Sequence, residues 1–307
     1  MDKMLHLSVS PHVHSGRSTA KIMRDVIIAL CPAAIAGTII FGWRSLLVIA
    51  TCILTCVLLE FLFNIITKKE QSIGDLSAVV TGLLLALNLP ANIPIWQCVI
   101  GSAFAILLVK CIFGGIGYNL VNPAITARVF MLVAFGSMTV QAFPTADTTS
   151  SATPLVSIAA GKSPALLDLF LGKTGGAIGE TCALALLIGF AYLLIRKVIS
   201  WHIPVAFVGS VFLLSFFMEG FDVMTALSLI LSGGLLIGAI FMATDYVTSP
   251  ATALGKIIFG VGAGLITFLI RYFGIYPEGV SFAILFMNIL NPYIEKLTAH
   301  KVFGGKK

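Results

Sequence analysis

Charged residues are scarce in this chain of 307 residues, in which only 10% of the positions are Asp, Glu, Lys or Arg. The surface of a soluble domain needs about a quarter charged residues, so this scarcity excludes a soluble globular protein. Instead, 58% of the residues are hydrophobic and the mean hydropathy is +1.05. Long apolar runs recur from Ile22 to Pro292 and predict a polytopic helical membrane protein. The net charge of +6 is then explained by orientation in a membrane, without nucleic-acid binding.

Motifs that would hold a soluble cofactor or a metal cluster are absent. None of the six cysteines forms a C-x-x-C pair, which argues against an iron–sulfur cluster held by this chain alone. There is no Walker loop, G-x-G-x-x-G or zincin motif, and the glycines lie within hydrophobic runs, which favours close helix packing. The first 18 residues contain no apolar run, so no cleaved signal peptide is expected. We predict no metal site and no catalytic residue in this chain.

The apolar runs predict an all-α fold of about ten transmembrane helices in a single integral membrane domain, residues 1–307. Two related five-helix halves are expected. Segments 76–89 and 204–218 are shorter than the roughly 20 residues of a full span, so broken or tilted helices packed against neighbours are expected there. The predicted spans are 22–43, 46–66, 76–89, 95–113, 121–143, 178–195, 204–218, 224–242, 257–273 and 280–294.

The distribution of Lys and Arg predicts the orientation of these spans. With the N-terminus in the cytoplasm, 15 of the 19 basic residues lie inside, which favours both termini inside. Residues 1–21 then form a cytoplasmic N-terminal segment and residues 295–307 a cytoplasmic tail. The longest connection, 144–177, falls outside the cytoplasm. Its apolar stretch 165–171 predicts a short interfacial or re-entrant helix.

This outer connection contains four consecutive small residues, Ser150, Ser151, Ala152 and Thr153. Small hydroxyl residues are common in loops, so the stretch alone is a weak signal. However, a hydroxyl group in an accessible loop with small neighbours is what a phosphoester to a bulky ring system requires. Pro154, which follows directly, can begin a helix and present its amide groups to a phosphate.

Charged residues near this stretch have two interpretations. Lys162 and Lys173 can neutralise a phosphate, or they can be solvated loop lysines. Asp147 is more typical of a turn or a cap than of a ligand. We keep Asp147 and Lys162 as weaker cofactor-binding candidates.

Ionisable residues in or beside the spans are costly and therefore candidates for function. Arg128 in the fifth span is expected either to extend to the cytoplasmic surface or to hold an anionic cofactor. Asp245, after the eighth span, is a candidate for ion coordination or for contact with a cofactor. Glu60 and Asp75 flank a connection that contains Lys68-Lys69, so ordinary pairing at the interface is expected for them.

Two segments of the chain resemble each other: residues 119–127 read NLVNPAITA and residues 245–253 read DYVTSPATA. In each, Pro-Ala stands where a helix can begin, with Asn122 or Ser249 as its cap. The segments are either two independent caps or the mark of two related halves. In the second case, half-helix N-termini would point at an anionic group near the middle of the membrane.

Motifs along almost the whole chain resemble one family. Residues 150–153 are similar to the S-x-A-T signature whose threonine carries FMN in the D subunits of Rnf-type complexes and the B subunits of sodium-pumping NADH:quinone oxidoreductases. The short N-terminal segment favours the Rnf type, because the B subunits usually carry a longer extension. Other matching stretches are SVSPH (8–12), MRDV (23–26), GDLSAVVTGLLLA (74–86), GGIGYN (114–119), NPA (122–124) and ATDYVTSP (243–250).

The resemblance implies a membrane electron-transfer subunit in which Thr153 carries FMN, attached outside the cytoplasm by a flavin transferase. It also implies a second, noncovalent flavin (riboflavin), whose contacts it does not assign. Electron flow from reduced ferredoxin to NAD⁺ would be coupled to Na⁺ or H⁺ translocation across a bacterial or archaeal plasma membrane. The implied partners are an extracytoplasmic FMN-bearing G subunit and the C, A, E and B subunits.

A competing hypothesis is a stand-alone channel or secondary transporter with inverted repeats and a midplane site at the two Pro-Ala breaks. Composition and the repeated segments fit this hypothesis equally well. Only the Ser150–Thr153 stretch and the resemblance along the chain discriminate between the two.

Overall fold

The computed structural model describes residues 18–136, 154–159, 165–274 and 279–299, and every regular element in these ranges is helical. The predicted all-α class is therefore confirmed. The elements are α1 (Thr19–Phe41), α2 (Trp43–Ile66), η1 (Ile73–Asp75), α3 (Ser77–Leu87), α4 (Ile95–Ala103), η2 (Phe104–Cys111), α5 (Pro123–Ala134), α6 (Pro154–Ala159), α7 (Leu166–Leu171), α8 (Ala183–Ile195), α9 (His202–Met218), α10 (Val223–Leu231), α11 (Leu235–Ile237), η4 (Gly238–Met242), α12 (Ala253–Phe273) and α13 (Val280–Thr298).

Three of these helices, α1, α2 and α12, are long and apolar enough to cross a membrane. The α10 helix and the continuous α11–η4 element form a fourth candidate that is bent by 66°. Five apolar helices are shorter, with 10–17 residues: α3, α4 with η2, α5, α8 and α9. The count of ten spans and the two five-helix halves remain predictions.

Two of the observed helices, α5 and α8, are shorter than the predicted spans 121–143 and 178–195 that contain them. The α5 helix ends at Ala134 instead of continuing toward residue 143, because Phe135 adopts an extended conformation (φ −127°, ψ 116°). The α8 helix begins at Ala183 instead of residue 178. The preceding turn is attached to another helix, since Gly179 N donates to Leu87 O of α3 over 2.8 Å.

The eighth predicted span is broken. It ends as α10 at Leu231 and resumes as α11 at Leu235, and the Ser232-Gly233-Gly234 stretch between them contains a left-handed residue, Gly233 (φ +67°). The α11 helix continues directly as the π-helix η4. The fourth predicted span likewise ends in a π-helix, η2. Such π-helical turns are rare and often occur at functional sites.

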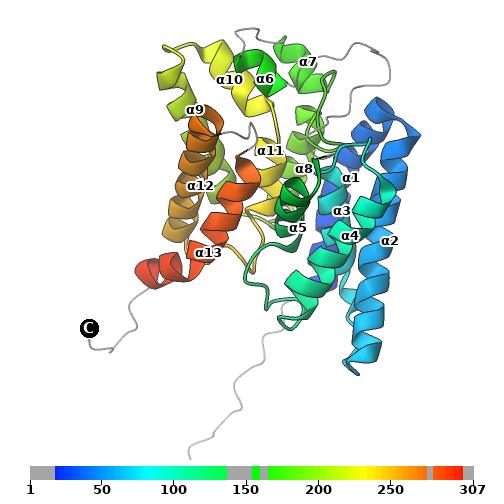
Figure 1. The fold of residues 1–307 in the computed structure, drawn as a ribbon. Helices are drawn as coiled ribbons and strands as arrows, with labels where there is room; N and C mark the ends of the chain where they lie inside the picture. The colour runs from blue at the N-terminus through cyan, green and yellow to red at the C-terminus, as the bar shows by residue number, and fades with distance from the viewer. Residues whose placement is uncertain (1–17, 137–153, 160–164, 275–278, 300–307) are drawn as a thin grey trace, which may run out of the picture.

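The short α3 helix lies inside the bundle. Ten of its eleven residues are buried, and it packs on α2, α1 and α5 (Figure 1). At about 1.5 Å per residue it is only half as long as a full span. This confirms the expectation of a short helix packed against neighbours at 76–89.

Two helices predicted in the outer connection are confirmed in its described parts, whereas the interfacial or re-entrant position of the second stays a prediction. The α6 helix begins at Pro154, and the stretch 165–171 forms the short helix α7. Figure 1 shows α6, α7 and α10 at the top of the bundle and the C-terminal end of α13 at the opposite end. This arrangement agrees with a connection and a C-terminal tail on opposite sides of a membrane, which remains a prediction.

The contact between α1 and α8 depends on Gly189. A Cβ at this position would overlap the carbonyl oxygen of Ala29 and would lie 2.9 Å from Cζ of Phe241. Replacement of Gly189 by alanine is therefore expected to destabilise the protein by about 1–3 kcal/mol, because backbone cannot yield as a flexible side chain does. The unfolding temperature of the Gly189→Ala variant in detergent, compared with that of the wild type, measures the loss of stability.

Gly209 of α9 provides the matched control, because a Cβ there meets nothing within 4 Å. Gly209→Ala is expected to leave the unfolding temperature unchanged or to raise it, since alanine favours helix by about 1 kcal/mol. Equal effects of the two substitutions would show that α1 and α8 do not pack as described.

Candidate functional site

Most of the predicted flavin-binding residues lie outside the described residues, so the structure says nothing about their positions. Among the predicted site residues, only Arg128 and Asp245 are described. Those outside are Asp147, Ser150, Ser151, Ala152, Thr153 and Lys162.

Arg128 does not extend to the surface. Its side chain is only 7% exposed, and Nη1 donates to Asn88 Oδ1 (3.0 Å) and to Ser281 Oγ (3.1 Å). The predicted extension of Arg128 to the cytoplasmic surface is therefore wrong, because Asn88 at the C-terminal end of α3 and Ser281 of α13 hold the guanidinium inside the bundle. Nη2 lies 3.9 Å from Oε2 of Glu180, whose side chain is 5% exposed.

Asp245 organises the turn between η4 and α12. Its Oδ2 accepts from Thr248 Oγ1 (3.2 Å), and its carbonyl oxygen accepts from Ser249 N (3.1 Å) and Ser249 Oγ (2.6 Å). The turn brings the carboxylate to the wall of a cavity. The predicted position of Asp245 at a helix break is therefore confirmed. Its roles in ion coordination and flavin contact stay predictions.

The two similar segments cap their helices differently. Asn122 caps α5 as predicted, with Oδ1 accepting from Ala124 N (3.0 Å) and Ile125 N (3.3 Å). The second prediction is wrong, because α12 begins at Ala253 and is capped by Thr252 rather than by Ser249. The hydroxyl of Ser249 is bonded to the Asp245 turn instead.

These two segments nevertheless meet in space. Asn122 Nδ2 donates to Met242 O (3.3 Å) at the end of η4. The amide of Asn288 lies between the two segments as well. With its oxygen and nitrogen assigned from their neighbours, the oxygen accepts from Asn122 N (3.2 Å) and the nitrogen donates to Thr248 O (3.2 Å). Asn88 Nδ2 also reaches Met242, at Sδ (3.5 Å), and so connects this junction to Arg128.

A cavity lies beside this junction, with apolar walls and a few polar groups. It provides about 100 Å³ for solvent. The Oδ1 atom of Asn119 is buried and has no hydrogen-bond partner among the described residues. The polar groups that line the cavity are Ser77, Thr81, Lys110, Asn119, Asn122, Thr244 and Asp245.

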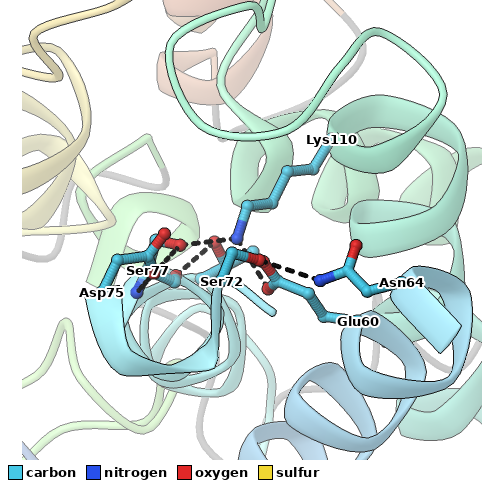
Figure 2. Close-up of polar contacts among 7 residues, drawn as sticks. Glu60, Asn64, Ser72, Asp75, Ser77 and Lys110 are labelled. Carbon is cyan, nitrogen blue, oxygen red and sulfur yellow. Dashed lines mark hydrogen bonds and ion pairs between the residues drawn. The ribbon is translucent and has the colours of Figure 1, made fainter. Parts of the chain in front are cut away.

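One wall of the cavity belongs to a buried ion pair, shown in Figure 2. Lys110 Nζ of η2 donates to Glu60 Oε2 of α2 (2.7 Å) and to Ser77 Oγ (2.6 Å), and both charged side chains are at most 3% exposed. Glu60 Oε1 accepts from Ser72 Oγ (2.6 Å), which accepts in turn from Asn64 Nδ2 (3.0 Å). Each charged group is thus both paired and hydrogen-bonded, as burial requires.

The predicted pairing at the membrane interface is therefore wrong for Glu60, because η2 brings a buried lysine to it while Lys68-Lys69 is exposed. Asp75 instead accepts from Ser77 N (2.7 Å) and Ser77 Oγ (2.5 Å), which places it at the edge of the same network.

The sequence prediction missed Lys110 and Glu180. Lys110 stands within the apolar run 95–113, and Glu180 stands at the start of the run 178–195. Arg128 and Asp245 are singled out because an ionisable residue inside an apolar run is a functional candidate. The same rule applies to Lys110 and Glu180.

In the described residues, these features define an all-helical protein with helices long and apolar enough to span a membrane, a broken helix, and charged pairs buried among them. The chain belongs to the NQR2, RnfD, RnfE family, whose model matches residues 6–304.

Relatives in this family are similar over almost their whole length. The D subunit of the Na⁺-translocating ferredoxin:NAD⁺ oxidoreductase complex of Acetobacterium woodii is 46% identical, covering 99% of this chain and 96% of the relative. The D subunit of the proton-translocating ferredoxin:NAD⁺ oxidoreductase complex of Clostridium ljungdahlii is 40% identical, covering 98% and 96%. The D subunit of the ion-translocating oxidoreductase complex of Salmonella newport is 34% identical, covering 99% of each chain.

Proposed function

We propose that this chain is the membrane electron-transfer subunit of an Rnf-type complex, with FMN bound covalently to Thr153. The complex couples electron flow from reduced ferredoxin to NAD⁺ with translocation of Na⁺ or H⁺. The observation that carries the proposal is the S-x-A-T stretch at 150–153 in a chain that is 46% identical to a D subunit over its whole length. When bound, the flavin supplies the redox chemistry, and the protein supplies its attachment and surroundings.

The described neighbours of Thr153 suit such a group. The α6 helix starts one residue later, and Leu155 packs with Leu229 in an apolar cluster. Leu155 and Arg271 both lie directly against Gly233. An added Cβ at this glycine would be 2.8 Å from Leu155 Cδ1 and 3.2 Å from Arg271 Nη2. An apolar surface and a guanidinium group therefore lie together beside Leu155 in the first turn of α6, which suits a flat ring and a phosphate respectively.

The proposal includes location and partners. The subunit would lie in a bacterial or archaeal plasma membrane with both termini in the cytoplasm and the flavin connection outside. The bias of 15 of 19 basic residues toward one side supports this orientation. Its partners would be the G, C, A, E and B subunits of the complex.

The proposal is tested by expressing the wild-type chain with and without a flavin transferase. In-gel fluorescence of the denatured protein is expected only with the transferase, and mass spectrometry is expected to locate FMN on the peptide that contains Thr153. A membrane-inserted chain that never fluoresces under these conditions would favour the stand-alone transporter hypothesis instead.

We further propose that a noncovalent riboflavin binds in the cavity beside Asn122. The apolar walls with few polar groups are typical of cofactor sites, and the unpartnered Oδ1 of Asn119 can accept from an N–H group of the ring. A tricyclic ring needs more than the present 100 Å³, so side chains at the rim, such as the half-exposed Tyr246, must move to admit it.

Replacement of Asn119 by leucine is expected to lower the riboflavin content about tenfold, since one hydrogen bond to a buried polar group is worth about 1–2 kcal/mol. Extraction and chromatography of flavins from the purified protein measure this, while the covalent FMN should stay unchanged. The control is Asn92→Leu at an exposed asparagine. Unchanged riboflavin in the Asn119 variant would exclude this cavity.

A further inference from the structure

Two apolar grooves flank the helix α9 on the outside of the bundle. One lies between α9 and the helices α8, α10, α11 and η4 and has a volume of about 410 Å³. The other lies between α9 and α12 and has a volume of about 460 Å³. Ser210 is the only polar side chain that lines them among the described residues. Figure 1 shows α9 and α12 along the side of the bundle opposite α2.

The two grooves share one ridge. Val205 and Gly209, which are one turn apart on α9, line both of them, so the grooves run side by side along this helix. Val205 is 52% exposed, and a Cβ at Gly209 would meet nothing within 4 Å. At this ridge, both grooves are therefore open to the surroundings of the bundle.

The length of the grooves matches the depth of one leaflet of a bilayer. Along α9, the first groove extends from Pro204 to Phe212 and the second from Val205 to Leu214, which is about 12–14 Å at about 1.5 Å per residue. The hydrocarbon core of a bilayer is about 30 Å thick, so one leaflet contributes about 15 Å. Two neighbouring grooves of this length fit the two acyl chains of one phospholipid.

The α9 and α12 helices begin at the same end of the bundle. A Cβ at Gly260 of α12 would lie 2.9 Å from Ile203 O. A Cβ at Gly264, one turn later, would lie 2.9 Å from Phe207 O, which is also one turn later. The two helices therefore run in parallel, and their N-terminal ends lie together.

Positive charge and a tryptophan are present at this end. Lys197 lies in the connection that leads into α9, and Lys256 lies in the first turn of α12, next to Ile257 in the wall of the second groove. Trp201, directly before α9, is 54% exposed and stacks on the ring of His202. Tryptophan is typical of the headgroup level of a membrane, and basic residues at this level attract anionic lipids.

Two pairs of opposite charges also lie at this end. Arg196 is paired with Asp25 at 3.3 Å. Glu295 and Lys296 stand next to each other near the end of α13, which packs on α12. Because the charges within each pair offset one another, the two lysines at the start of α9 and α12 make this end of the grooves positive.

Apolar walls alone do not select a ligand here, because the lipid chains around the bundle are as apolar as the grooves. The selection must come from the headgroup and from the number of chains. We propose that the two grooves bind one anionic diacyl phospholipid of the bilayer, with one acyl chain on each side of the ridge of Val205 and Gly209. Its phosphate lies beside Lys197 and Lys256. The site is independent of the proposed function, since it requires neither flavin nor ion transport.

The headgroup preference is tested with the purified full-length chain in micelles that contain equal amounts of phosphatidylglycerol and phosphatidylcholine. Native mass spectrometry is expected to show one retained phosphatidylglycerol. Lys197→Gln with Lys256→Gln is expected to lower the preference for phosphatidylglycerol about 25-fold, because each basic residue near an anionic headgroup contributes about 1 kcal/mol, or about fivefold. The matched control is Lys68→Gln with Lys69→Gln, at two exposed lysines of the connection between α2 and η1.

The grooves are tested by filling them. Gly209→Trp places an indole ring where a Cβ has room, and it is expected to lower the amount of retained phospholipid at least tenfold with either headgroup. The matched control is Leu58→Trp, at a 55% exposed position of α2. The lysine variant changes only the end of the grooves and remains decisive if Gly209→Trp does not fold.

The occupant in the membrane is identified with a photoreactive benzophenone amino acid in place of Val205. Illumination of cells that express the chain with its natural partners is expected to give an adduct with the added mass of a phospholipid. An adduct with a second copy of the chain or with another membrane protein would overturn the proposal. Equal retention of the two phospholipids by the wild type, or equal effects of the groove variants and their controls, would overturn it as well.

Discussion

Thr153→Ala is expected to remove the in-gel flavin fluorescence of the denatured protein completely. The phosphoester needs the threonine Oγ, and alanine has no atom that can form this bond. The whole fluorescence signal should disappear, because the covalent flavin is expected at this one hydroxyl group. The substitution lies outside the apolar spans, so insertion of the chain into the membrane should stay normal.

Two neighbouring serines provide matched controls for this prediction. Ser150→Ala and Ser151→Ala remove a hydroxyl from the same stretch and are expected to retain the covalent flavin. If fluorescence remains in the Thr153 variant and disappears in one of the serine variants, the attachment point has been assigned to the wrong residue.

Lys110→Met is expected to lower the free energy of unfolding by about 3–5 kcal/mol, because it leaves the Glu60 carboxylate buried without its cation. The pair is short, at 2.7 Å, and both side chains are almost fully buried. Methionine has a similar length and keeps the packing of η2, so loss of the charge dominates the effect. Chemical or thermal unfolding in detergent measures the change.

Two further variants separate the buried charge from the loss of a lysine as such. Lys69→Met removes an exposed lysine and should change stability by less than about 0.5 kcal/mol. The double variant Glu60→Gln with Lys110→Met removes both charges and is expected to recover most of the lost stability. Equal effects of Lys110→Met and Lys69→Met would mean that the buried pair does not form.

Local features of the fold could be predicted well from the sequence. Asn122 with Pro123 is a cap followed by a first-turn proline, and the helix begins there. The helix start at Pro154 and the short helix at 165–171 follow from the same local rules. Each of these features depends on side chains within one turn of the residue concerned, so neighbours in the sequence contain the necessary information.

The charged pairs could not be predicted in the same way. Glu60 meets Lys110 across 50 positions, and Arg128 meets Glu180 through a segment that is hydrogen-bonded to the end of α3. In the sequence, Lys68-Lys69 is the nearest cation pair to Glu60, but helix packing leaves it exposed. Partner choice is therefore a property of how the helices pack.

The sequence alone determined the helical membrane class, because hydrophobic burial and backbone hydrogen bonding depend on composition and on local periodicity. Its S-x-A-T stretch also singled out Thr153 as the residue to test. Only the tertiary structure decided where the eighth predicted span breaks and which charges share the interior. The physical reason is that a buried charge is stable only beside a partner, and the packing of distant helices supplies that partner.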